Sequence, residues 1–284
     1  MFDHLTSIKK QLRGIAKSDR LTSLNLSKLA REYLITCKVE EKSPRTIETY
    51  SMVIQRYLSF NSQHPSTSQI REFLLSLQGT LKHSSVHIYY RSLKTFFNWL
   101  VAEGYIEKSP MQNIKVSQPP DPLIRPFSRE DIDNLLILCS GSSFLDIRNR
   151  AIILLFIDTG LRLSGLASIQ YKDVDSDREV IKVKGKGAKE CVVKIGHGVQ
   201  KVLLKYMNQV DYNSVDDCIW VTEERKPMKR AGIQIAIRRL CHRAEITDAK
   251  PGPHTFRHTA AINLLRNGMG EFVLQVTLGC LVCH

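Results

Sequence analysis

The sequence predicts a mainly α-helical fold with a small β-sheet, made of an N-terminal helical bundle and a C-terminal mixed α/β domain. Four amphipathic helical patterns follow one another between residues 26 and 103. A proline-rich stretch over residues 108–126 can hold neither a helix nor a central strand. Beyond it, two short runs rich in β-branched residues flank a glycine-bearing turn between residues 180 and 195. The small sheet is therefore expected in the second domain.

The first domain is expected to span residues 23–106 and to follow a polar, basic and flexible arm at residues 1–22. Ser43-Pro44 is a start signal for its second helix, and Gly104 ends its fourth. The spacing of apolar residues predicts helices over residues 26–37, 45–60, 67–77 and 83–103.

The second domain is expected to span residues 127–284, after a linker over residues 107–126. Ser128 and Asp131 resemble a capping box, which would open a helix running to about Cys139. The further predicted elements are a helix over residues 147–158 that Thr159-Gly160 ends, and two strands at residues 180–183 and 191–195.

The charge balance favours a polyanionic partner. Lys and Arg number 41 against 28 acidic residues among 284, which gives a formal net charge of +13. This excess favours nucleic acid over membrane, although a merely basic soluble protein is the alternative. No apolar run reaches the roughly 20 residues that a membrane helix needs, and no signal peptide is recognisable. We therefore expect a cytoplasmic protein with no membrane partner.

The seven cysteines predict neither disulfides nor a cofactor. They are scattered and odd in number, which favours reduced thiols. The segment Cys280-Leu281-Val282-Cys283-His284 has the spacing of a c-type haem attachment site, but that chemistry belongs to exported proteins. A second ligand pair at zinc spacing is also missing. We expect no haem, no metal and no other cofactor.

Basic residues gather at two helix starts in the first domain, where positive charge opposes the helix dipole. Phosphate contact would explain this placement better than helix stability does, and a solvated basic face is the alternative. The candidate DNA-binding residues are Lys42, Arg45, Lys82, His83, Arg91 and Lys94.

Four basic residues of the second domain occupy positions suited to holding a phosphate. His254 and Arg257 lie three apart at the start of a predicted helix, where free N–H groups and the dipole favour an anion. Arg162 is a single cation among leucines, and it has to snorkel, pair or bind an anion. Lys186 would lie at the tip of the predicted hairpin. Taken singly, His254 and Arg257 are also explained by a solvated basic turn, and Lys186 by an exposed basic hairpin.

The order of these motifs resembles that of the tyrosine recombinases of the phage-integrase type. The resemblance covers about residues 24–284. In the first domain it rests on SPRTI at 43–47, FNWL at 97–100 and EGY at 103–105, which resemble a core-binding domain. In the second it rests on TGLRLS at 159–164, GKGAKE at 185–190, HTFRH at 254–258 and LG at 278–279, which resemble a catalytic domain.

The resemblance implies DNA strand breakage and rejoining without metal or ATP. A tyrosine would attack a phosphodiester, giving a 3′-phosphotyrosyl link and a free 5′-hydroxyl. Arg162 and Arg257 match the two arginines that clamp the non-bridging oxygens, a role suited to planar, permanently charged donors. Lys186 matches the general acid for the leaving 5′-oxygen, and His254 matches the acid/base histidine.

The chain departs from the family pattern at three places. Gly165 stands where most members have an acidic residue, and Cys280 where most have histidine. The nucleophilic tyrosine is expected beyond Cys280, but the sequence ends at His284 without one. Neither Tyr171 nor Tyr206 is expected to replace it, because nucleophile placement tolerates errors of about 1 Å.

These departures leave two functions open. The first is a site-specific recombinase or integrase, truncated before its nucleophile and therefore deficient in cleavage. The second is a non-catalytic DNA-binding regulator or decoy with the same fold. Double-stranded DNA is the expected partner in both, with further recombinase subunits on that DNA. An unrelated helical transcription factor is disfavoured by the ordered Arg, Lys, His and Arg set.

Overall fold

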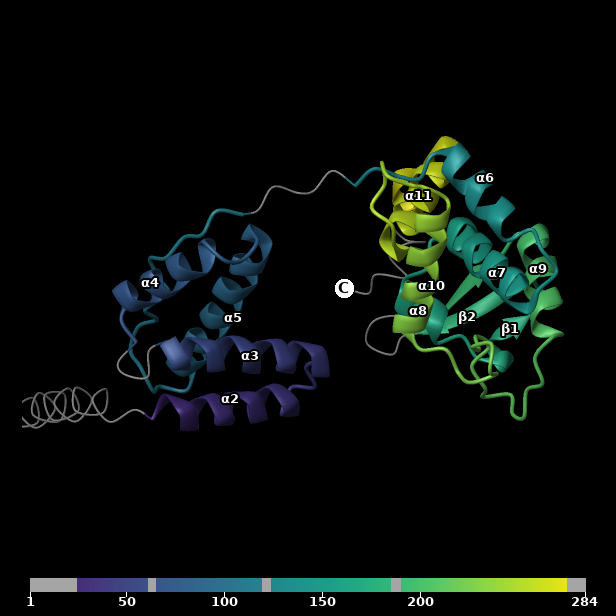
Figure 1. Cartoon of the computed structure of the whole chain (residues 1–284). Helices are drawn as coiled ribbons and strands as arrows, with labels where there is room; N and C mark the ends of the chain where they lie inside the picture. Colours follow the sequence, from purple (N-terminus) through teal and green to yellow (C-terminus); the bar gives the residue numbers. More distant parts are fainter. Residues whose placement is uncertain (1–24, 61–64, 119–123, 185–189, 275–284) are drawn as a thin grey trace, which may run out of the picture. The chain divides into compact units, whose positions relative to one another are not determined.

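The computed structural model of the chain describes residues 25–60, 65–118, 124–184 and 190–274. It divides into two compact units, Met1–Asp121 and Pro122–His284 (Figure 1). Each unit is built around its own hydrophobic core. The mainly helical fold with one small sheet is confirmed. Among the described residues, no helix combines the length and apolar character required to cross a bilayer.

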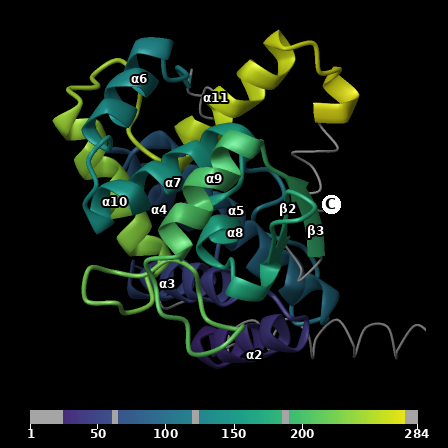
Figure 2. The same ribbon diagram turned by 90° about the vertical axis from the view of Figure 1, so that its right-hand side faces the viewer.

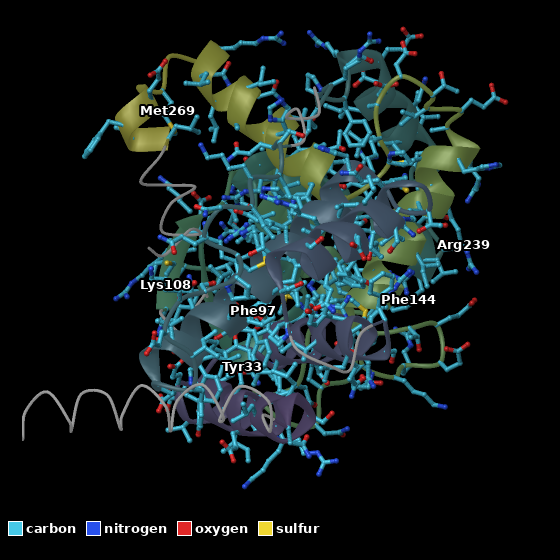
Figure 3. The ribbon with its side chains drawn as sticks, turned by 90° about the vertical axis from the view of Figure 1, so that its left-hand side faces the viewer. Tyr33, Phe97, Lys108, Phe144, Arg239 and Met269 are labelled. Atoms are coloured by element: carbon cyan, nitrogen blue, oxygen red, sulfur yellow. The ribbon has the colours of Figure 1, made fainter. Side chains whose placement is uncertain are left out.

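In the described residues, the N-terminal unit is a bundle of four helices. Its centre is aromatic: Tyr57 packs edge-on against Phe73 and Phe97, with ring centroids 5.3 and 5.9 Å apart. Figure 3 labels Tyr33 and Phe97 among the packed side chains of this bundle. The helices are α2 (Leu26–Val39), α3 (Pro44–Phe60), α4 (Thr67–Gln78) and α5 (His83–Ala102).

Local signals explain where these helices begin and end. Ser43 accepts a hydrogen bond from the Thr46 backbone N–H at 3.1 Å, so it caps α3 as Ser43-Pro44 predicted. Gly104 follows the end of α5 with a φ of 74°, a conformation that favours glycine. The predicted bounds of the four helices therefore agree with the structure to within two residues.

The segment after α5 packs against the bundle, although its proline content predicts that most of it is a linker. Met111 and Ile114 are 0% and 5% exposed and belong to the core of the N-terminal unit. The Tyr90 hydroxyl donates a hydrogen bond to the Ile114 carbonyl at 2.9 Å. The proline content excludes regular structure here, but it does not prevent an irregular segment from burying apolar side chains.

In its described residues, the C-terminal unit combines helices with a three-stranded antiparallel sheet in the order β1-β2-β3. The predicted hairpin is confirmed by the register of β2 and β3, in which Ile181 pairs with Val193 and Val183 with Cys191 (Figure 2). The elements are α6 (Arg129–Leu138), α7 (Phe144–Thr159), α8 (Leu163–Ala167), η1 (Tyr171–Asp173), β1 (Val174–Asp175), β2 (Val180–Lys184), β3 (Glu190–Lys194), α9 (His197–Met207), α10 (Arg230–Arg243) and α11 (Pro253–Arg266).

Two helix ends in this unit follow the predicted signals. Ser128 and Asp131 form the reciprocal hydrogen bonds of a capping box at the start of α6. Gly160 ends α7 in the left-handed conformation, with a φ of 62°. The helix begins three residues earlier than predicted because Ser143 accepts a hydrogen bond from the Asp146 N–H.

Helices α9 and α10 were not among the predicted elements. Both carry apolar residues at helical spacing, such as Ile233 and Ile237 in α10, which are 0% and 1% exposed. The apolar pattern of α10 is hard to recognise in the sequence, because basic residues are interspersed among its apolar ones. Figure 3 shows one of them, Arg239, on the outside of the helix.

Candidate active site

The turn after α7 brings Arg162 next to α11. Gly160 ends α7 in the left-handed conformation, and Arg162 then stands at the N-cap of α8, half-buried. The Arg257 Nη1 atom donates a hydrogen bond to the Gly160 carbonyl at 2.6 Å, across 97 residues of sequence. The two arginines therefore come from distant segments and lie at one place in the C-terminal unit.

The positive charges of the two arginines interact. Burial, and next the charge of Arg162, lower the pKa of Arg257 to about 10. Arg257 remains protonated at neutral pH, because that value is still well above 7. Two guanidinium groups thus lie at the same place, an arrangement that an anion would stabilise.

Helix α11, which carries Arg257, packs against α7 and against the segment before α6. The Phe256 ring contacts Phe127 and Phe156, with centroids 4.6 and 5.8 Å away. The Thr259 hydroxyl accepts a hydrogen bond from the Phe127 N–H at 2.9 Å and donates one to the Thr255 carbonyl. Such contacts keep the helix in register with α7, so a ligand would meet pre-positioned side chains.

Asp158, the carboxylate nearest to Arg162 in the sequence, is engaged elsewhere. It accepts a hydrogen bond from the Gly196 N–H at 2.8 Å, at the start of α9. Among the described residues, Arg162 has no ion-pair partner. The departure at Gly165 adds no carboxylate either, and that residue is buried within α8. An added Cβ at Gly165 would meet only the Leu161 side chain, at an ordinary contact distance of 3.7 Å.

Of the other predicted site residues, the structure describes His254 but not Lys186 or Cys280. His254 lies in the first turn of α11, is exposed, and lines a hollow of ≈ 510 Å³. Spacing of three on one helix keeps His254 and Arg257 on adjacent faces. Lys186 and Cys280 lie outside the described residues. Their predicted roles stay predictions.

Sequence reasoning missed the cations that share this hollow with His254. Arg125, Arg238 and Lys250 line it together with Gln234 and Asp248. Because α10 was not predicted, its periodicity could not be used. Gln234 and Arg238 are four residues apart on that helix and therefore lie on the same face. Arg125 and Lys250 stand in irregular segments, for which periodicity gives no direction.

The described tyrosines of the C-terminal unit make hydrogen bonds or ring contacts with other residues of that unit. Tyr206 is fully buried, and its hydroxyl donates a hydrogen bond to the Ile219 carbonyl and accepts one from the Val221 N–H. Burial also raises the pKa of Tyr206 to about 12, which opposes the phenolate form. Tyr171 is 43% exposed and packs against Tyr212, with ring centroids 4.8 Å apart.

In the N-terminal unit, Arg45 and Arg91 line one groove of ≈ 240 Å³ between α3 and α5, together with Thr49 and Thr95. Arg45 also pairs with Glu48 at 2.7 Å, but both side chains are largely exposed. The groove thus carries two solvent-accessible cations from different helices.

The remaining basic candidates of this unit are engaged locally or exposed. Lys42 forms an ion pair with Glu40 at 2.7 Å, which raises the pKa of the lysine. His83 Nε2 is hydrogen-bonded to the Ser117 hydroxyl at 3.0 Å, and Lys94 lies over the Tyr90 ring. Lys82 is exposed at the N-cap of α5 and makes no side-chain capping bond.

Comparisons with known proteins identify the family. Residues 126–280 match the phage integrase family, and residues 29–107 match the N-terminal SAM-like domain of phage integrases. The chain belongs to the phage integrase family.

Relatives extend over most of the chain. A tyrosine recombinase XerA from Thermococcus onnurineus is 29% identical and covers 89% of this chain and 87% of its own length. A tyrosine recombinase XerC from Lactobacillus delbrueckii subsp. bulgaricus is 26% identical, over 88% of this chain and 90% of the relative. The resemblance read from the motifs is thus confirmed along both units.

Solved structures share the fold. A lambda integrase tetramer bound to a Holliday junction has a TM-score of 0.75 at 16% identity, covering 95% of this chain and 80% of that one. The Tn1549 transposon integrase in complex with transposon right end DNA has a TM-score of 0.72 at 17% identity, with 88% and 90% covered.

Proposed function

We propose that the protein is a site-specific DNA recombinase that holds a scissile phosphate of duplex DNA between Arg162 and Arg257. The observation that carries the proposal is the hydrogen bond from Arg257 to the Gly160 carbonyl, which brings two protonated guanidinium groups together at one place. Planar guanidinium groups suit the non-bridging oxygens of a phosphodiester. The DNA-bound integrases of the same fold agree with this partner.

The chemistry assigned to this site is the transfer of a DNA phosphoryl group from the 5′-oxygen of the next nucleotide to a tyrosine. The phenolic oxygen attacks phosphorus, the bond to the 5′-oxygen breaks, and the leaving oxygen takes up a proton. We assign that proton to Lys186, and the acid/base role near the nucleophile to His254. Arg162 and Arg257 would stabilise the charge that grows on the non-bridging oxygens.

The 284 residues contain the proposed clamp but no tyrosine after Cys280. A polypeptide of these residues alone is therefore proposed to bind DNA without forming the phosphotyrosyl link. Histidine is the stronger hydrogen-bond donor to a phosphate, so Cys280 would also weaken the site. The N-terminal unit would contribute to binding through the groove that Arg45 and Arg91 line, with Lys42, Lys82, His83 and Lys94 on the same unit.

Assembly on DNA is part of this proposal. The lambda integrase structures include a dimer bound to a core site and a tetramer bound to a Holliday junction. We infer that several copies of this protein act together on one DNA substrate.

A suicide substrate tests the proposal. The duplex is first selected from a random library by binding, and then synthesised with a nick that traps any phosphotyrosyl product. We expect no covalent product from the 284-residue polypeptide on a denaturing gel, with or without EDTA. A variant with Cys280→His and a family-like tail that bears a tyrosine should form the product, and Arg162→Gln in that variant should abolish it.

The second candidate, a non-catalytic DNA-binding regulator or decoy, is favoured by Gly165 and Cys280. It predicts that the repaired variant binds the selected duplex but forms no covalent product. A covalent product from the unmodified polypeptide would contradict both candidates in their present form, since an unassigned tyrosine would then be the nucleophile.

A further inference from the structure

The hollow beside His254 collects three cations from three separate segments. Arg125 precedes α6, Arg238 lies on α10, and Lys250 lies in the loop that leads to α11. All three side chains are exposed. Their convergence is a tertiary feature, because 113 residues separate Arg125 from Arg238 in the sequence.

Positive charges outnumber negative ones among the residues that line this hollow, although Arg125 and Asp248 also border a neighbouring hollow that Glu130, Asp131 and Asp133 line. Asp248 is the single carboxylate among the residues that line it. Within the described part of the chain, neither Asp248 nor any of the three cations forms an ion pair. Three positive charges around one hollow repel one another, so their arrangement favours a bound anion.

The place of the hollow indicates which anion it would hold. His254 borders it, and His254 stands three residues before Arg257 on the same helix. Consecutive phosphates of one DNA strand follow each other at about 3.4 Å along the helix axis. A strand whose scissile phosphate lies at Arg257 would thus carry its neighbouring phosphates past the first turn of α11.

We propose that Arg125, Arg238 and Lys250 form a second phosphate subsite that binds a DNA backbone phosphate adjacent to the scissile one. Gln234 supplies an amide donor to the same hollow. This inference rests on the proposed function, because it takes the phosphate at Arg162 and Arg257 as its reference. The three cations are positioning residues: they set the register of the strand and do not touch the reacting atoms.

Salt-dependent binding tests the subsite. Each phosphate contact contributes a slope of roughly −0.9 to log K against log salt concentration. Arg125→Gln, Arg238→Gln and Lys250→Gln should each make the slope shallower by roughly one and weaken binding about fivefold, as measured by fluorescence anisotropy. Arg239→Gln is the matched control, because Arg239 neighbours Arg238, is exposed and does not line the hollow. It should change the slope less.

Phosphate-ethylation interference on the selected duplex locates the contact. Ethylation should interfere with the unmodified protein at the scissile phosphate and at a neighbouring one. In Arg125→Gln the neighbouring signal should disappear while the scissile signal remains; in Arg162→Gln the scissile signal should weaken. A neighbouring signal that persists in Arg125→Gln, while the scissile signal still weakens in Arg162→Gln, would overturn the subsite and leave the proposed function standing.

If the proposed function is wrong, Arg162→Gln and Arg257→Gln should leave both the salt slope and the ethylation interference unchanged.

Free inorganic phosphate is the other anion that this hollow could bind. In one outcome, millimolar inorganic phosphate raises the melting temperature of the unmodified protein but not that of Arg125→Gln or Lys250→Gln. If these substitutions also leave the salt slope of DNA binding unchanged, the hollow binds free phosphate and the DNA subsite is overturned. A circular dichroism spectrum of each variant verifies that it is folded.

Discussion

At the scale of single residues, the arginine pair combines a cost in stability with a gain in binding. Arg257 is half-buried, and burial together with the Arg162 charge lowers its pKa from the ordinary value of 12.5 to about 10. Because the folded value is lower than the unfolded one, the charged form opposes folding at every pH below about 10. The contribution of this group to stability improves only as the pH rises from 10 towards 12.5.

Removing one charge of the pair should therefore stabilise the protein and weaken its DNA binding. We expect Arg162→Gln to raise the unfolding free energy by roughly 0.5–1 kcal/mol at pH 7, the range in which partly exposed charges interact. Affinity for duplex DNA should fall about tenfold or more, since a hydrogen bond to a charged group contributes about 1.5–3 kcal/mol. Urea unfolding and fluorescence anisotropy measure the two effects.

Arg178→Gln provides the comparison, because Arg178 is exposed and its nearest charged partner is Asp175 at 3.9 Å. That substitution should leave stability almost unchanged. A clear loss of stability in Arg162→Gln would show that the arginine is a structural residue, and would argue against the phosphate clamp.

At the scale of elements, the turn between α7 and α8 joins the two halves of the candidate site. Gly160 adopts a φ of 62°, which lets α7 end and places its carbonyl against Arg257. The Thr159 hydroxyl donates to the Leu155 carbonyl and accepts a hydrogen bond from the Leu161 N–H at 3.3 Å, which braces the turn. The position of Arg257 thus depends on the conformation of a turn in another part of the chain.

A side chain at Gly160 should disturb both folding and the site. We expect Gly160→Ala to lower the unfolding free energy by about 1–2 kcal/mol, because an L-residue pays that amount in the left-handed region. Binding of the selected duplex should weaken as well, since the Gly160 carbonyl anchors Arg257. Thermal unfolding and anisotropy check the two outcomes.

Gly198→Ala is the matched control in α9. An added Cβ at Gly198 meets nothing within 4 Å, and the residue lies within a helix. Alanine there should stabilise the protein by about 0.5–1 kcal/mol and leave DNA binding unchanged. Equal effects of the two substitutions would mean that the Gly160 conformation has no special role.

At the scale of the whole molecule, the chain is strongly basic and folds into two units, each with its own hydrophobic core. Each unit carries exposed cations: Arg45 and Arg91 in the first, and Arg125, Arg238 and Lys250 in the second. A polyanion that contacted both units would gain affinity from their linkage without any contact between them. Separated units should therefore bind DNA more weakly than the whole chain.

The extent of the N-terminal unit can be tested with two fragments. A fragment of residues 25–118 should fold and bind duplex DNA weakly, with a shallower salt slope than the whole chain. A fragment of residues 25–104 lacks Met111 and Ile114, each of which contributes about 1.5–3 kcal/mol when buried. It should lose most of its stability in urea unfolding, and equal stability of the two fragments would contradict the observed packing.

Motif order and local periodicity carried much of this information in the sequence. The helices of the first unit, the capping box at Ser128 and the turn at Gly160 follow from rules that act over a few residues. The family could be inferred because its motifs recur in one order, and the net charge of +13 pointed to nucleic acid. Such features are local or additive, so they can be read without knowledge of how the chain packs.

Only the tertiary structure showed which distant residues meet. The contact between Arg257 and the Gly160 carbonyl depends on packing of Phe256 against Phe156, and the convergence of Arg125, Arg238 and Lys250 on one hollow depends on three segments at once. The engagement of Asp158 by Gly196 and the burial of Met111 were likewise invisible to periodicity. The spacing of side chains along one helix or strand shows which residues share a face of that element. Which other element packs against that face depends on the burial of apolar surface across the whole unit.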